Sequence, residues 1–220
     1  MNVSGHKFFL LFLFLLTTLV LYPYAENGGF RYLAFRVLGS VAILVAIYAI
    51  RLPRTLFLIA LLLAVPAILE RMLALQADAG FLSALNIVLS FAFDLFVVVA
   101  IFRRVFTKDE PTSETVFGAL CIYLLVGFTF TSVYGMVAAI QSRAFYLDPL
   151  TNLHTVPNRF DFIYYSFATL TSLGASGITP VSAQARSLSV IEAILGVLYL
   201  AVLIGRLIGA YRHPSASGHS

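Results

Sequence analysis

The residues that could do chemistry lie between Arg159 and Pro180, in the sequence RFDFIYYSFATLTSLGASGITP. The first half reads as a short amphipathic helix, and the second half, residues 172–177, consists mostly of small residues. The helix is too short to cross a bilayer, which takes roughly 20 apolar residues, yet longer apolar segments lie on both sides of it. Irregular backbone at membrane depth is tolerated only where it packs in protein or lines a water-filled cavity. The pattern therefore predicts a re-entrant pore loop.

The segment TLTSLGASGITP resembles the signature of the tetrameric potassium channel superfamily, T-x-T-T-[VL]-G-Y-G-D-x-x-P. Aligned without gaps, Thr169 and Thr171 match the end of the family's pore helix, and residues 178–180 match the exit. Ser172 falls on the threonine that opens the family's selectivity filter. The resemblance implies that permeating monovalent cations bind at Ser172, Leu173 and Gly174. It implies a filter and its flanks formed by Thr171, Ser172, Leu173, Gly174, Ala175, Ser176 and Gly177.

The chain departs from that signature in the middle of the filter. Ala175 stands where the family has Tyr or Phe, Ser176 where it has the second Gly, and Gly177 where it has Asp. Such a filter replaces the water around a cation with backbone carbonyls, and glycine adopts the positive φ this needs at low cost. A non-glycine residue such as Ser176 costs about 1–3 kcal/mol there. We expect the inner sites to survive and the outer ones to widen or disappear, which lowers selectivity for potassium over sodium or abolishes conduction.

The residues after the filter extend the resemblance over 115–210, because residues 185–209 are similar to the inner helices of bacterial members. A charged residue is costly inside a bilayer, so Glu192 is expected to brace the pore helix through Thr169, Thr171 or Ser172, or else to reach the interface. Gly196 falls at the family's gating hinge, and close helix packing is the alternative. Tyr165 is expected to support the filter by packing. The chain has one pore loop where the family's pore needs four, which implies a homotetramer.

Two alternatives belong to other classes of protein. A tetramer with this fold and a decayed filter would be a non-conducting structural or regulatory membrane protein. Residues 174–177 also spell G-x-S-G, the nucleophile motif of rhomboid intramembrane proteases, with Ser176 as nucleophile. A serine nucleophile needs a base within hydrogen-bond reach, and residues 184–209 contain no His. We therefore predict that the protein is not an enzyme.

Composition agrees with a membrane protein. The 220 residues are 60% hydrophobic and only 11% charged, which leaves no room for a sizeable soluble domain. The formal charge of +4 fits membrane orientation, with the lipid bilayer as partner and no nucleic acid. The single Cys121 cannot form an internal disulfide. No cofactor is expected beyond the permeating ion, potassium or alternatively sodium.

The apolar runs predict an all-α membrane protein. Its expected spans are residues 8–25, 30–50, 55–75, 81–102, 115–140 and 184–209. These organise as a four-helix transmembrane domain (1–107), a pore domain of helix, turret, pore loop and inner helix (115–210), and a short disordered tail (211–220). We interpret residues 8–25 as a retained span, because Pro23 makes a poor signal-peptide cleavage site before Ala25.

Basic residues predict a multi-pass protein of the cell membrane with both termini in the cytoplasm. In that orientation the inner positive charges outnumber the outer ones, as the positive-inside rule requires. The inner set is Lys7, Arg51, Arg54, Arg103, Arg104, Lys108, Arg206 and Arg212. The outer set is Arg31, Arg71, Arg143, Arg159 and Arg186. The same orientation places the filter mouth outside.

Two further charges, Arg36 and Asp94, fall inside expected spans. An isolated charge at mid-bilayer costs about 2.5–3.5 kcal/mol on insertion scales, so we expect these two to pair with each other. The fourth span lacks an Arg at every third position. No strong voltage sensing is expected from residues 1–104.

Overall fold

The computed structural model describes residues 7–25, 29–50, 53–73, 81–106, 112–152, 154–174 and 177–211, and it is mostly helical. Its helices are α1 (Lys7–Ala25), α2 (Gly29–Ile50), α3 (Arg54–Leu73), α4 (Phe81–Phe106), α5 (Ser113–Ile140), α6 (Arg159–Leu170) and α7 (Ala183–Tyr211). The expected spans fall on α1–α5 and α7, and the expected pore helix is α6. The helical boundaries agree with those read from the apolar runs to within a few residues.

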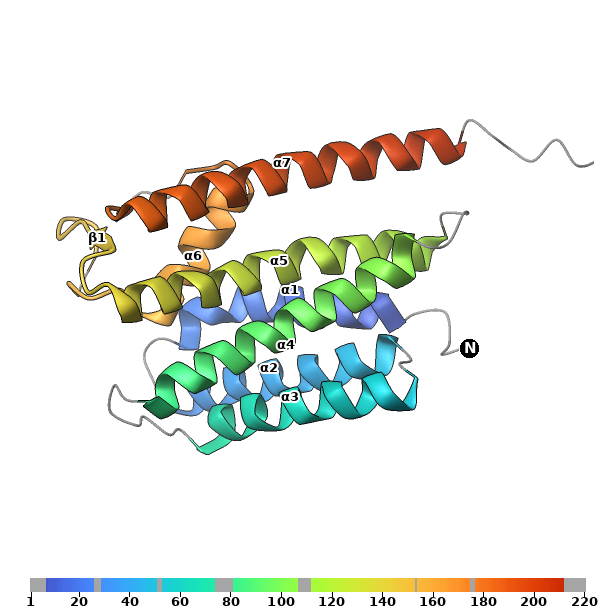
Figure 1. Ribbon diagram of the computed structural model, residues 1–220, viewed down its shortest axis with the longest axis horizontal. Coiled ribbons are helices and arrows are strands. Elements are labelled where there is room, and N and C mark those ends of the chain that lie inside the picture. Colours follow the sequence, from blue (N-terminus) through green and yellow to red (C-terminus); the bar gives the residue numbers. More distant parts are fainter. Residues whose placement is uncertain are drawn as a thin grey trace, which may run out of the picture.

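The long helices lie side by side in one bundle, with α7 on one side and α1–α5 on the other (Figure 1). The short helix α6 lies between α5 and α7 and contacts both of them. Helix α1 begins and α7 ends at the same end of the bundle, and the strand β1 (Phe145–Leu147) lies at the opposite end. The pore helix therefore enters the bundle from the end that carries the loop between α5 and α6.

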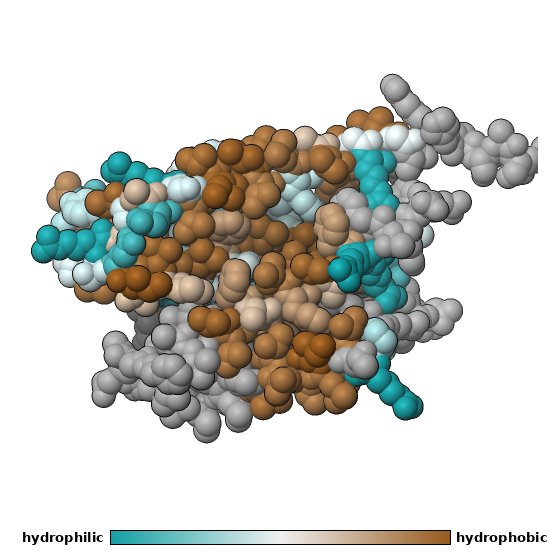
Figure 2. Space-filling model, viewed as in Figure 1, coloured by the Kyte–Doolittle hydropathy of each residue, from teal (hydrophilic) through white to brown (hydrophobic). Residues whose placement is uncertain are grey.

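The surface and the helices indicate an integral membrane protein. Figure 2 shows a broad apolar band across the middle of the molecule with hydrophilic residues towards its two ends. Among the described residues, the helices long and apolar enough to cross a membrane are Lys7–Tyr24, Ser113–Ile140 and Ala183–Gly209. Shorter apolar stretches, Val37–Ala49 and Leu56–Val65, lie in α2 and α3. The six spans and their orientation remain predictions.

The N-terminal helices are packed against α5 by a common apolar core. Leu11 of α1, Ile101 of α4 and Ile122 of α5 are almost completely buried in it. A Cβ atom added to Gly118 of α5 would lie only 2.5 Å from a methyl carbon of Val105, so the glycine permits close approach of α4. The thiol of Cys121 donates to the Phe8 carbonyl at 3.3 Å.

The charged residues inside the expected spans are only partly described. Asp94 is buried, as a carboxylate inside a bilayer should be. The side chain of Arg36 lies outside the described residues, so its pairing with Asp94 remains a prediction.

The expectation of an all-α fold is wrong in one place. The strand β1 pairs antiparallel with β2 (Ile178–Pro180), and the register sets Leu147 opposite Ile178. The two strands come from the loop before the pore helix and from the chain that leaves the filter. Their backbone groups satisfy each other where neither segment has a helix to do so. This pairing ties the exit of the filter to the turret, which is the segment 141–158.

Candidate functional site

The filter segment begins with a tight turn at the end of α6. The N–H of Ser172 donates to the Thr169 carbonyl at 2.9 Å, and the N–H of Gly174 donates to the Ala168 carbonyl at 3.2 Å. Ser172 has a φ of 58° and Gly174 a φ of 82°. Sequence reasoning assigned positive φ to glycine and did not foresee it at Ser172, where it is strained for an L-residue. Ser176, where strain was expected, lies outside the described residues, as does Ala175.

The described filter residues are directed away from the packed interior of their own subunit. Residues 171–174 are all exposed, and Leu173 is 77% exposed. A Cβ atom added to Gly174 would meet no other atom within 4 Å. The hydroxyl of Thr171 is the exception, because it donates to the Phe167 carbonyl at 2.7 Å and so belongs to the pore helix. The segment between Ser172 and Gly174 is thus open to solvent or to a neighbouring chain.

Gly177 lies at the far end of the expected filter segment from α6. Its φ is 89°, and its carbonyl accepts the N–H of Asp148 at 2.9 Å and the side-chain amide of Asn152 at 2.7 Å. A carbonyl oxygen has two lone pairs, and both are engaged here. Although the signature aligns Gly177 with the filter mouth, its carbonyl is occupied by the turret and is not free to bind a cation.

Glu192 contacts the pore helix, but through other residues than those expected. It is completely buried, and its two carboxyl oxygens lie 2.5 Å from the hydroxyls of Ser166 on α6 and Tyr134 on α5. Thr169, Thr171 and Ser172 were the expected partners, yet they lie at or beyond the end of α6, about one turn past Ser166. Burial explains the arrangement, because a carboxyl group without water needs donors on both oxygens. The carboxyl of Glu192 therefore joins three helices.

Tyr165 packs beside this group, on the side of α7. Its hydroxyl lies 2.5 Å from Ser189 Oγ, which itself donates to the Ala185 carbonyl. Its ring meets Tyr134 edge to face at a centroid separation of 4.9 Å and Phe145 at 5.4 Å. Edge-to-face pairs of this kind add to the stabilisation given by burial. Tyr165 thus links the pore helix to α5, α7 and the turret.

The end of the pore helix is packed against α7 at Gly196. A Cβ atom there would lie 2.0 Å from the carbonyl oxygen of Leu170, which also accepts the Tyr123 hydroxyl at 3.2 Å. Only a residue without a side chain permits this approach. Close packing is therefore an observed property of Gly196, while a hinge at Gly196 stays a prediction.

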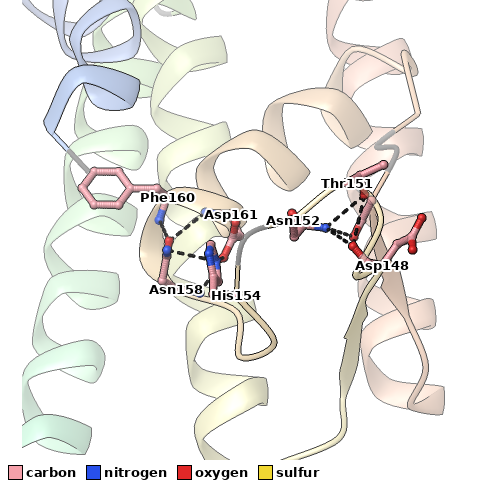
Figure 3. Close-up of polar contacts among 8 residues, drawn as sticks. Asp148, Thr151, Asn152, His154, Asn158, Phe160 and Asp161 are labelled. Atoms are coloured by element: carbon pink, nitrogen blue, oxygen red, sulfur yellow. Dashed lines mark hydrogen bonds and ion pairs between the residues drawn. The ribbon is translucent and has the colours of Figure 1, made fainter. Parts of the chain in front are cut away.

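The start of the pore helix is capped by a separate group in the turret (Figure 3). The Asn158 side chain accepts the N–H groups of Phe160 and Asp161, and the Asp161 carboxylate accepts the N–H of Asn158 at 2.7 Å. His154 Nε2 lies 2.8 Å from the same carboxylate. This reciprocal capping satisfies N–H groups that a helix start leaves without intrahelical partners. Ring stacking between Phe160 and Tyr22 brings α1 to the same point.

Sequence reasoning missed the partners that position the filter, namely Tyr134, Ser166 and Asn152. Ser166 carried a usable signal, because it is the hydroxyl on the pore helix that precedes Thr169 by about one turn. Tyr134 and Asn152 carried none, since their positions depend on how α5 and the turret fold back.

Comparison with known proteins agrees with this geometry. Residues 119–213 match the family model described as ion channel, which includes α6, the filter and α7. Searches among curated proteins and among solved structures found no significant match. Over residues 119–213, the chain is therefore similar to the pore domain of potassium channel-like ion channels. The prediction of a membrane-embedded ion channel is confirmed at this level.

Proposed function

We propose that the chain is the subunit of a homotetrameric cation channel that conducts passively through the filter Ser172–Ser176. Cations bind the backbone carbonyls of Ser172, Leu173 and Gly174, and the substitutions at 175 and 176 reduce selectivity for potassium over sodium. The observation that carries the proposal is the exposed, glycine-containing turn at the end of a pore helix, within the segment that matches the ion channel family.

One face of α7 supports assembly with further copies. The buried residues of α7, among them Glu192 and Gly196, face α5 and α6 of the same subunit. Ile194, Leu198 and Val202 are more than half exposed and apolar. This face is available to neighbouring subunits and to the pore in a tetramer. Residues 1–107 form a four-helix transmembrane domain that packs against α5 of the pore domain, and both termini lie in the cytoplasm of a cell-membrane protein.

Ion flux from purified protein in liposomes tests the proposal. Flux of potassium, rubidium and sodium is compared between the wild type, empty liposomes and the double variant A175Y/S176G. Wild-type flux with a potassium preference below that of the double variant is the expected result. No flux in the wild type, with flux restored in the double variant, would instead favour the non-conducting structural or regulatory role.

The protease alternative is tested separately. Among the described residues, His154 lies in the turret and is engaged with Asp161, so it offers no base on α7. Labelling of Ser176 by a fluorophosphonate probe, lost in S176A, would revive an intramembrane serine protease.

A further inference from the structure

The turret contains a compact turn, Asp148–Asn152, that contacts the Gly177 carbonyl at the filter exit. Within the turn, the N–H groups of Thr151 and Asn152 both donate to the Asp148 carbonyl, at 3.1 and 3.0 Å. The Asp148 carboxylate accepts the N–H of Leu150 at 3.0 Å. The turn is therefore closed by its own hydrogen bonds and is a firm support.

The side chain of Asn152 connects this turn to the filter. Its amide nitrogen donates to the Gly177 carbonyl at 2.7 Å. The same nitrogen lies 3.0 Å from the Asp148 carbonyl and 3.2 Å from Thr151 Oγ1 (Figure 3). The two amide hydrogens are thus shared among three acceptors, of which the Gly177 carbonyl is the nearest. The Asp148 N–H binds the same Gly177 oxygen, as a further rung beyond the β1–β2 pair.

The fit around Gly177 is tight as well as polar. A Cβ atom added to Gly177 would lie 2.6 Å from Thr151 Oγ1 and 3.1 Å from Asn152 Nδ2. The filter segment is thus fixed at two points, by the end of α6 at Ser172 and by the turret at Gly177. The position of the second point sets how far apart the carbonyls between them can lie.

We propose that Asn152 is a positioning residue for ion selectivity, which acts by fixing the Gly177 carbonyl and with it the outer end of the filter. The inference rests on the channel function proposed above. The inference gives the turret a role in ion selectivity that does not require a turret residue to contact the ion.

The test uses the full-length protein with the variants N152A and N152D. The aspartate keeps the shape of asparagine but adds a negative charge and has no hydrogen to donate, whereas the alanine removes the hydrogen bonds without adding a charge, so an effect shared by both variants follows from the lost hydrogen bonds. L150A is the matched control, because Leu150 is 93% exposed in the same turn and its only polar contact there is made by its backbone. The permeability ratio of potassium to sodium is measured in planar bilayers.

Both Asn152 variants are expected to change that ratio by about threefold to tenfold, since each of the four subunits loses the hydrogen bond from Asn152 to the Gly177 carbonyl. The control L150A is expected to keep the wild-type ratio. A second measurement compares the melting temperature of the solubilised protein in potassium and in sodium. A residue that positions the filter alters the difference between the two salts, whereas one that only supports the fold lowers both values equally.

The outcomes are distinguishable. A conducting wild type whose Asn152 variants keep its ion ratio and its salt difference would overturn this inference and leave the channel function intact. Loss of assembly in both variants, with normal assembly of L150A, would assign Asn152 a folding role and also overturn the inference. A wild type with neither flux nor salt-dependent melting would overturn the channel function and the inference together.

Discussion

The two ends of the filter segment are fixed by different means. At the inner end, the carboxyl of Glu192 and the backbone of Gly196 lie against α6 with no exposure to solvent or almost none. At the outer end, Asn152 and Gly177 are only half-buried and belong to loops. Polar groups without water depend wholly on their protein partners, while those near water can exchange them. We therefore expect the inner contacts to determine folding and assembly, and the outer contacts to determine ion selectivity.

The largest effect should come from the inner carboxyl. E192A leaves the Tyr134 hydroxyl without its buried acceptor, whereas the Ser166 hydroxyl keeps the Gly127 carbonyl. A buried hydroxyl left without its acceptor costs about 1–3 kcal/mol, and the cavity left by the side chain adds about 2 kcal/mol or more, so the free energy of unfolding should fall by about 3–5 kcal/mol. The expected result is loss of assembled protein, measured by size-exclusion chromatography and thermal denaturation in detergent.

E192Q is the matched control for that substitution. The Ser166 hydroxyl has one hydrogen but two acceptors, the Gly127 carbonyl at 2.7 Å and the Glu192 carboxyl at 2.5 Å. A glutamine can accept from Tyr134 and donate to Ser166, which leaves the Ser166 hydrogen for Gly127. E192Q should therefore assemble nearly as well as the wild type. If E192A did so too, the inner end would not depend on this group, and the contrast between the two ends would fail.

The next effect in size comes from Gly196. G196A places a methyl group 2.0 Å from the Leu170 carbonyl oxygen, so α7 must move away from the pore helix. Overpacking of this kind costs at most about 3 kcal/mol in most cores, and we expect the upper end because the obstacle is backbone. The measurement is the melting temperature of the purified protein.

G205A is the control for helix propensity, because a Cβ atom at Gly205 of α7 meets nothing within 4 Å in the subunit. Alanine is better than glycine in a helix by up to about 1 kcal/mol, so G205A should be neutral or stabilising. A hinge at Gly196 makes the opposite prediction for G196A. It would leave the melting temperature unchanged and alter only the open probability of the channel.

A substitution at the outer end of the filter segment should lower the stability less than E192A does. It should change the potassium to sodium permeability ratio more. G177A forces a φ of 89° on an alanine and brings its Cβ 2.6 Å from Thr151 Oγ1. Strain of this kind costs about 2 kcal/mol. We expect assembled protein with an altered potassium to sodium permeability ratio, and G135A, which meets nothing within 4 Å on α5, should preserve that ratio. Equal loss of assembly in G177A and E192A would remove the distinction between the two ends.

Sequence reasoning predicted the helices well and the supports of the filter only in part. The long apolar runs determine α1, α5 and α7 because burial in lipid depends on composition and length alone. Glu192 could be singled out because a carboxyl in an apolar helix must have partners. Ser166 could have been named beside Thr169 as a candidate partner, but the two differ by less than one turn, and only the crossing of α6 and α7 decides between them.

The contact between Asn152 and the Gly177 carbonyl was harder to predict than the contacts of Glu192, for a different reason. Asn152 is one of many polar residues in a loop, and asparagine there is typical of any turn. Its role appears only when β1 pairs with β2 and brings the turret to Gly177, which is a contact between segments far apart in the chain. The positive φ at Ser172 was missed similarly, because it follows from how the end of α6 turns and not from the residue type.

The smallest predicted effect concerns the start of the pore helix, and it tests whether the turret acts as one unit. N158A removes the side chain that accepts the N–H groups of Phe160 and Asp161. Loss of such a cap costs about 1 kcal/mol, so the melting temperature should fall by only a few degrees. Because Asn158 caps the start of α6, its loss should leave the potassium to sodium permeability ratio unchanged, unlike that of Asn152. A shift of that ratio in N158A as large as in N152A would show that any loosening of the turret changes ion selectivity. The hydrogen bond to the Gly177 carbonyl would then have no particular role in selectivity.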